Sequence, residues 1–151
     1  MRILKASQKD LQEILNLQYL AYQREAIICN NPNIPPLSQT LKDLETEFET
    51  YVFLKVVNED GCIVASVRTY SDNGTLYIGK LMVLPDLQGR GIGTGLLKAI
   101  EQVCPHKRYE LFTSTKSERN IKLYERLGYV KFREQDAGND LRFIYLCKTT
   151  I

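Results

Sequence analysis

The feature that most constrains the fold is an apolar strand that runs into a glycine-dense turn at the start of a helix. This segment covers residues 83–97, and its glycines stand at alternate positions: Gly89, Gly91, Gly93 and Gly95. Closely spaced glycines let backbone N–H groups approach a ligand, and the first turn of a helix adds unpaired N–H donors and the positive end of its dipole. The segment therefore predicts an anion site that suits a diphosphate.

Two common phosphate-binding motifs do not fit this turn. The dinucleotide fingerprint G-x-G-x-x-G fails because its third glycine would fall on Thr94 or Leu96. A G-x-x-x-x-G-K match at residues 74–80 is followed by Leu81 instead of a metal-binding hydroxyl, and it lies in an expected strand. We therefore treat the second match as a chance one.

The turn does resemble the Q/R-x-x-G-x-G/A motif of the GCN5-related N-acetyltransferase (GNAT) family. The match is Gln88–Gly93, preceded by Val83-x-Pro85. Downstream, residues 120–129 (NIKLYERLGY) are similar to that family's N-x-x-x-(L/F)-Y-x-(K/R)-L-G-(F/Y) segment. The resemblance is specific across about residues 76–130, and it implies a single GNAT-type domain over residues 1–151.

The order of expected elements agrees with this fold. Alternating apolar residues and turn residues predict strands near 2–6, 51–57, 62–70, 75–84, 109–113, 129–134 and 141–148. Helical spacing predicts helices over 7–25, from a cap at Ser38, over 92–103 on an Ile92, Leu96, Ile100 and Val103 stripe, and from a cap at Ser117 to Leu127. The prolines exclude helix at 30–36. We expect an α/β (α+β) fold: a mixed, mostly antiparallel sheet of about seven strands, with one parallel crossover and about four flanking helices.

The resemblance implies that acetyl-CoA is the co-substrate and assigns residues to hold it. The diphosphate would be held by Gln88, Gly89, Arg90, Gly91, Ile92, Gly93 and Thr94. The pantetheine arm would pair with backbone groups of Leu81, Met82 and Val83, and Asn120 would hydrogen-bond the arm. Tyr124 matches the family's general acid, which protonates the departing thiolate; without the motif it would be a packing residue beside Leu123 and Leu127.

The general base stays open in the sequence. An alkylammonium group with a pKa near ~10.4 must lose a proton, which costs about 4–5 kcal/mol at pH 7. Many family members place a carboxylate on the strand before the glycine turn, but residues 76–83 (LYIGKLMV) contain none. Glu25, Glu110, Tyr77 and water are the alternatives.

The acceptor should bind over the sheet, near the loop at residues 30–36. Tyr19, Tyr22, Arg68 and Tyr70 are the candidates to line its site. Arg68 could hold an acceptor carboxylate, or it could be a solvated arginine on a strand.

Composition narrows the function further. The chain has 151 residues and a formal net charge of +2, which gives no bulk electrostatic case for nucleic acid or a membrane surface. Its four cysteines and one histidine lack metal-ligand spacing. We expect the protein to be a cytoplasmic monomer or homodimer that binds no metal. We expect it to act as an N-acetyltransferase on a primary amine of a small molecule or peptide. The alternative is a non-catalytic acyl-CoA-binding sensor or regulatory module.

Overall fold

The protein is built on one seven-stranded sheet with the strand order β1-β2-β3-β4-β5-β7-β6. The computed structural model describes residues 1–150, so Ile151 of the predicted domain lies outside the described residues. The strands are β1 (Arg2–Lys5), β2 (Val52–Val57), β3 (Ile63–Asp72), β4 (Thr75–Val83), β5 (Arg108–Ser114), β6 (Val130–Asp136) and β7 (Arg142–Thr149). The helices are α1 (Leu11–Ile28), α2 (Leu41–Phe48), α3 (Ile92–Val103) and α4 (Glu118–Arg126), with 3-10 turns at Gln8–Asp10, Pro35–Leu37 and Pro85–Leu87.

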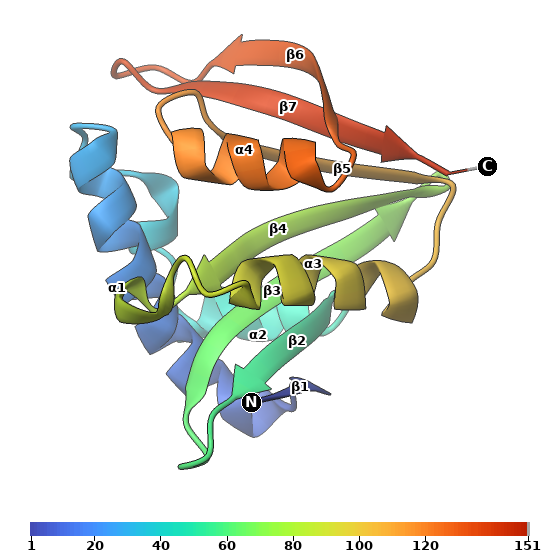
Figure 1. The fold of residues 1–151 in the computed structure, drawn as a ribbon. Helices are drawn as coiled ribbons and strands as arrows, with labels where there is room; N and C mark the ends of the chain where they lie inside the picture. The colour runs from blue at the N-terminus through green and yellow to red at the C-terminus, as the bar shows by residue number, and fades with distance from the viewer. Residues whose placement is uncertain (151) are drawn as a thin grey trace.

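Neighbouring strands are antiparallel except for β4 and β5, which are parallel. The β3–β4 hairpin turns at Asn73 and Gly74, whose φ angles are +49° and +80°. Two left-handed residues in a row are typical of the tight turns that match strand twist. Helix α3 makes the crossover from β4 to β5 (Figure 1). The predicted mixed sheet with four helices and one parallel crossover is confirmed.

The helices cover both faces of the sheet, with α3 and α4 on one face and α1 and α2 on the other (Figure 1). On α3, Leu96, Leu97 and Ile100 are fully buried against the sheet. Burial of each such side chain stabilises the fold by about 1.5–3 kcal/mol. Val103, the last residue of the predicted stripe, is 43% exposed, because the helix leaves the sheet as it ends.

Four details of the helices differ from the sequence prediction. Helix α1 continues past Glu25 to Ile28, since no glycine or proline stands there to end it. Thr40 rather than Ser38 caps α2, where its hydroxyl accepts a hydrogen bond from the N–H of Asp43. Ser38 instead closes the short 3-10 turn at Pro35–Leu37, which overlaps the end of the stretch 30–36 that was predicted to lack helix. Ser117 precedes α4 without a side-chain capping bond. No helix of the described chain combines the length and the apolar character needed to cross a bilayer.

Candidate active site

A cavity of about 1020 Å³ opens where β4 and β5 separate. The two strands pair only from Thr75–Tyr77 to Arg108–Glu110, and beyond that point they diverge (Figure 1). Residues 78–83 of β4 and 111–114 of β5 then face each other across the cavity instead of pairing. The edge of β4 therefore carries backbone groups that a ligand can reach. Leu81, Met82 and Val83, predicted to hold the pantetheine arm, all line this edge.

The glycine turn (residues 88–94) closes one end of the cavity. Gly89 and Gly91 have φ angles of +80° and +83°, which only glycine adopts without strain. A Cβ atom built on either residue would meet no atom within 4 Å, so the space beside the backbone is open. Gly91 is the N-cap of α3, and its carbonyl accepts the N–H of Gly95 at 3.0 Å. The N–H groups between these two residues have no partner within the helix, which makes this end a site for an anion.

Helix α4 and the end of β4 both contact the turn. A Cβ on Gly93 would lie 3.4 Å from Leu123 of α4, so Gly93 permits the close approach of α3 and α4. Gln88 donates to the carbonyl of Val83 at 3.3 Å and accepts from Arg119 of α4 at 3.2 Å.

Two arginines lie near the turn, and they differ in their relation to the cavity. Arg90 is exposed and is not among the residues that line the cavity, whereas Arg119 lines it. Sequence analysis missed Arg119, although it stands directly before Asn120 of the second motif. Ile92 and Thr94, also predicted to contact the cofactor, line the cavity with Gln88 and the glycines.

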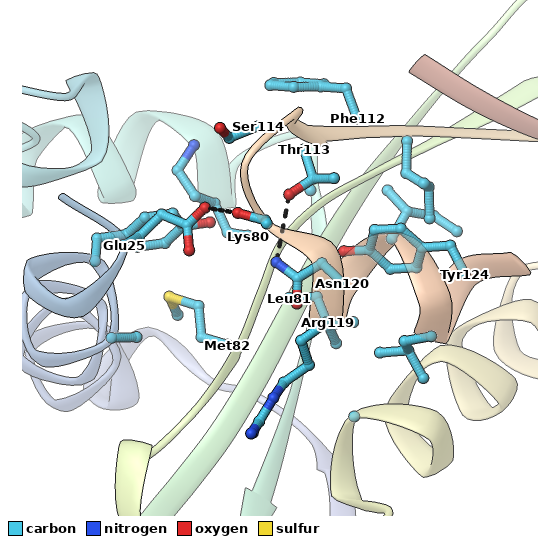
Figure 2. A pocket seen from close by; sticks show the side chains of 18 of the residues that line it. Glu25, Lys80, Leu81, Met82, Phe112, Thr113, Ser114, Arg119, Asn120 and Tyr124 are labelled. Atoms are coloured by element: carbon cyan, nitrogen blue, oxygen red, sulfur yellow. Dashed lines mark hydrogen bonds between the residues drawn. The ribbon is translucent and has the colours of Figure 1, made fainter. Parts of the chain in front are cut away.

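Tyr124 and Asn120 lie one turn apart on α4 and both face the cavity (Figure 2). The Tyr124 hydroxyl points into the cavity, and the residue is 5% exposed. Burial raises the pKa of Tyr124, and the negative charges that Tyr22 and Glu25 would carry raise it further. The phenol therefore keeps its proton at neutral pH. Asn120 donates to the Thr113 hydroxyl of β5 at 3.3 Å, which links α4 to the far wall of the cavity.

The candidate bases all line the cavity, but they differ in their partners. Glu25 of α1 accepts a hydrogen bond from the Ser117 hydroxyl. Glu110 of β5 is paired with Arg108 at 2.7 Å. Tyr77 stacks on Tyr70, with 5.0 Å between the ring centroids. Several proton acceptors thus share the cavity, and none is distinguished by geometry alone.

The acceptor candidates come together at the α1 side of the cavity, with one exception. Tyr22, Arg68 and Tyr70 line it, together with the loop around Pro35 and Pro36 that was predicted to border the acceptor. Burial raises the pKa of Tyr22 to about 12; the Arg68 charge lowers this pKa and Glu25 raises it. Tyr19 lies outside the lining, because its hydroxyl donates to the carbonyl of Gln39. Arg68 is 2% exposed, so the alternative of a solvated arginine is wrong.

Comparisons with known proteins agree with this geometry. The family model "Acetyltransferase (GNAT) family" matches residues 10–129. S-(2-succino)cysteine N-acetyltransferase of Bacillus subtilis (strain 168) is 30% identical over 157 residues, covering 95% of this chain and 92% of that protein. UPF0157 protein YqkA of the same organism is 27% identical over 131 residues; the match covers 86% of this chain but 37% of that protein's length. The resemblance seen in the two motifs is confirmed.

Solved structures support the same fold at low sequence identity. The PaiA N-acetyltransferase of Thermoplasma acidophilum, solved in complex with coenzyme A, has a TM-score of 0.81 at 13% identity, covering 99% of this chain and 98% of the other. The ribosomal-protein-S18-alanine N-acetyltransferase of Escherichia coli has a TM-score of 0.80 at 17% identity, covering 98% and 92%. At these identities the likeness establishes the fold.

Proposed function

This chain belongs to the acetyltransferase (GNAT) family, and we propose that it moves the acetyl group of acetyl-CoA directly to the primary amine of a small-molecule acceptor, with Tyr124 as general acid. The family makes it an acetyl-CoA-dependent N-acetyltransferase. The observation that carries the proposal is that the Tyr124 hydroxyl and the amino end of α3 open onto one cavity. Acetyl transfer from a thioester that carries phosphates requires both features in one cavity: an anion site to bind the phosphates and an acid to protonate the departing sulfur.

The glycine turn fits the diphosphate of coenzyme A. The open space beside Gly89 and Gly91 and the unpaired N–H groups of α3 suit a bound phosphate, and Arg119 adds a positive charge. The free edge of β4 at residues 81–83 suits the amides of the pantetheine arm, which would bind as an added strand. Asn120 would donate to or accept from the same arm. Acetyl-CoA supplies the activated acetyl group as a thioester.

Tyr124 would act on the sulfur as the C–S bond breaks and the new N–C bond forms. Its raised pKa keeps the proton on the hydroxyl until that moment. The hydroxyl then donates a hydrogen bond to the developing thiolate, and the proton moves to sulfur as negative charge accumulates there. The proton lost by the amine leaves through water. The interaction strengthens only in the transition state, so it raises the rate more than the affinity.

The relative that matches over nearly its whole length supports a small acceptor. Its name assigns it S-(2-succino)cysteine, a modified amino acid. The structural neighbour from Escherichia coli, whose name gives an alanine of a ribosomal protein, is less similar at 17% identity. We therefore place the amine on a molecule of amino-acid size.

The proposal is tested with the Tyr124→Phe variant, by following thiol release from acetyl-CoA with a panel of amines. We expect kcat to fall about 10²–10⁴-fold, the usual loss for a general acid, while calorimetry shows coenzyme A affinity nearly unchanged. Tyr109→Phe is the matched control, because Tyr109 is an equally buried tyrosine outside the cavity.

Two outcomes contradict the proposal in different ways. A wild-type kcat in the Tyr124→Phe variant would leave Tyr124 as a packing residue. Coenzyme A binding without thiol release for any amine would instead favour a non-catalytic acyl-CoA-binding module.

A further inference from the structure

Arg68 is a buried guanidinium held rigidly at one end of the cavity. Its Nε lies 2.8 Å from Oε1 of Glu47, and its Nη2 donates to Gln18 at 3.0 Å and to Gln39 at 2.8 Å. Its Cζ stacks 5.2 Å from the centre of the Phe53 ring. The remaining nitrogen, Nη1, is buried and has no hydrogen-bond partner among residues 1–150. One donor group of a fixed cation is therefore left over beside the cavity.

The partners of Arg68 prevent it from turning to satisfy that donor elsewhere. Gln18 is fully buried, and its amide donates to Pro36 and to Gln39, each at 2.8 Å. Gln39 in turn donates to Oε2 of Glu47 at 3.0 Å. A buried donor without a partner costs free energy, and a native structure keeps one where a ligand or water completes it. Since Arg68 lines the cavity, a ligand in the cavity can complete it.

A second cation, Lys80, is brought to the same cavity by an irregularity in β4. The pairing of β3 with β4 slips between Ser66 and Arg68, and Lys80 at this bulge has a φ angle of +50°. Lysine rarely adopts this left-handed conformation, and such strain is concentrated at functional sites. Lys80 takes part in none of the ion pairs of the described chain. Burial and the Arg68 charge lower its pKa, and Glu47 raises it.

The charges at this end of the cavity do not balance. Glu47 is the only carboxylate that pairs with Arg68 or Lys80 in the part of the chain described, so two cations face one anion. The other carboxylates of the lining are Glu25, Glu110 and Glu118, and none of them forms an ion pair with either cation; Glu110 is paired with Arg108 instead. An excess positive charge with an unfilled guanidinium donor is complementary to a carboxylate.

The two cations line the same cavity as Tyr124. Tyr22 of α1 lines the cavity as well. Tyrosine rings also border the cavity: Tyr70 stacks on Tyr77 and lies tilted against Tyr51, with 5.0 Å between the ring centroids in each pair. A small molecule can therefore place one group at Arg68 and another near Tyr124.

From this arrangement we infer that the acceptor is an amino acid or a close derivative, whose carboxylate binds Nη1 of Arg68 and Nζ of Lys80 while its amine faces the thioester. The inference rests on the proposed acetyl transfer and specifies the substrate class. It also predicts that amines with a second ammonium group are poor acceptors, because the two cations would repel that group.

The test compares amines that differ only in the carboxylate. Purified protein and acetyl-CoA are assayed with the common L-amino acids, S-(2-succino)cysteine and other S-alkylated cysteines, each beside its carboxamide. We expect kcat/KM for the preferred acid to exceed that of its carboxamide about 10- to 100-fold, the worth of charge-assisted hydrogen bonds. Diamines should be poor acceptors.

Variants connect the preference to the two cations. Lys80→Asn removes the charge and retains a residue that tolerates the left-handed backbone, and we expect it to lower the acid-to-carboxamide ratio about tenfold or more. Arg68→Lys keeps a cation against Glu47 but removes Nη1, and should lower the ratio as well. Lys42→Asn, an exposed lysine on α2, changes the net charge equally and should leave the ratio intact.

The outcomes separate this inference from the proposed function. Acetyl transfer at equal rates to acids and carboxamides, or an acid preference that survives Lys80→Asn, would overturn the carboxylate site and leave the N-acetyltransferase in place. No transfer to any amine would overturn both. Thermal unfolding of each variant shows whether a lost preference reflects a lost fold.

Discussion

Replacing Gly91 by aspartate should weaken coenzyme A binding through charge rather than through loss of the fold. Gly91 is the N-cap of α3 and has a φ angle of +83°, and a Cβ built there points into open space. A carboxylate at this position would stand where the structure favours a diphosphate. Gly74, in the β3–β4 turn, has nearly the same φ angle of +80° and equally open surroundings, but it does not line the cavity. Gly74→Asp is therefore a control matched in backbone strain.

The magnitude can be divided into two parts. A non-glycine residue in the left-handed conformation costs about 1–2 kcal/mol of stability, and this should be similar at both positions. Two unit charges about 4 Å apart repel by ~1 kcal/mol in water and ~4 kcal/mol at an effective dielectric constant of about 20. Since ~1.4 kcal/mol is tenfold in affinity, we expect Gly91→Asp to raise the Kd of coenzyme A about tenfold or more.

Isothermal titration calorimetry with coenzyme A and thermal unfolding measure the two parts separately. Gly91→Ala should lose a similar amount of stability but less affinity than Gly91→Asp. High salt should narrow the difference between them, since the Debye length falls from ~10 Å at 0.1 M to ~3 Å at 1 M. An unchanged Kd in folded Gly91→Asp protein, or an equal loss in Gly74→Asp, would refute the assignment of the glycine turn to the diphosphate.

Three further outcomes are expected. Burial raises the pKa of Asp10, but hydrogen bonds from Lys55 at 2.7 Å and from Ser7 lower it by more. The carboxylate should therefore stabilise the fold above about pH 4 and lose that effect as the pH falls further. Asp10→Asn should lower the unfolding free energy by about 1–3 kcal/mol at pH 7 and make that free energy depend less on pH in acid. The logarithm of kcat/KM should rise with pH with a slope near one, because the amine loses its proton through water. For the same reason, Glu25→Gln and Glu110→Gln should each lower kcat/KM by less than about tenfold. A plateau from about pH 6–7 that one of these substitutions abolishes would identify a carboxylate base. Ile100→Ala should cost about 2–5 kcal/mol in chemical denaturation without changing KM for acetyl-CoA, and a loss under 1 kcal/mol would contradict the core assignment.

Structural features that depend on residues close together in the chain could be predicted from the sequence. The glycine turn follows from glycines at alternate positions before an apolar helical stripe, and Gly89 and Gly91 do adopt the left-handed conformation that only glycine favours. Turn chemistry at residues 58–61 and 71–74 likewise predicts the two hairpins. Strand order in the middle of the sheet then follows, since short turns join antiparallel neighbours.

Features that depend on distant residues could not be predicted in this way. Arg68 lies in a run of strand residues, and its neighbours in the sequence do not show what encloses it. The enclosing side chains are those of Glu47, of Gln18 on α1 and of Gln39 just before α2. The bulge that turns Lys80 into the cavity is a slip of register, and alternation along β4 does not reveal it. Arg119 approaches Gln88 only because α4 packs beside the start of α3.

One strand relates the donor side of the cavity to the acceptor side. After Tyr77, β4 leaves β5, and the same six residues, 78–83, form the free edge and contain the bulge at Lys80. They lead to the glycine turn through the 3-10 turn at Pro85–Leu87. The bulge changes which face each later residue takes, because side chains alternate along a strand. Shortening β4 by one residue at the bulge would therefore reverse Lys80 and also shift the edge that leads to the glycine turn. Both ends of the cavity thus depend on this one bulge. The strained conformation of Lys80 is therefore retained, because a regular β4 without the bulge would lose the site.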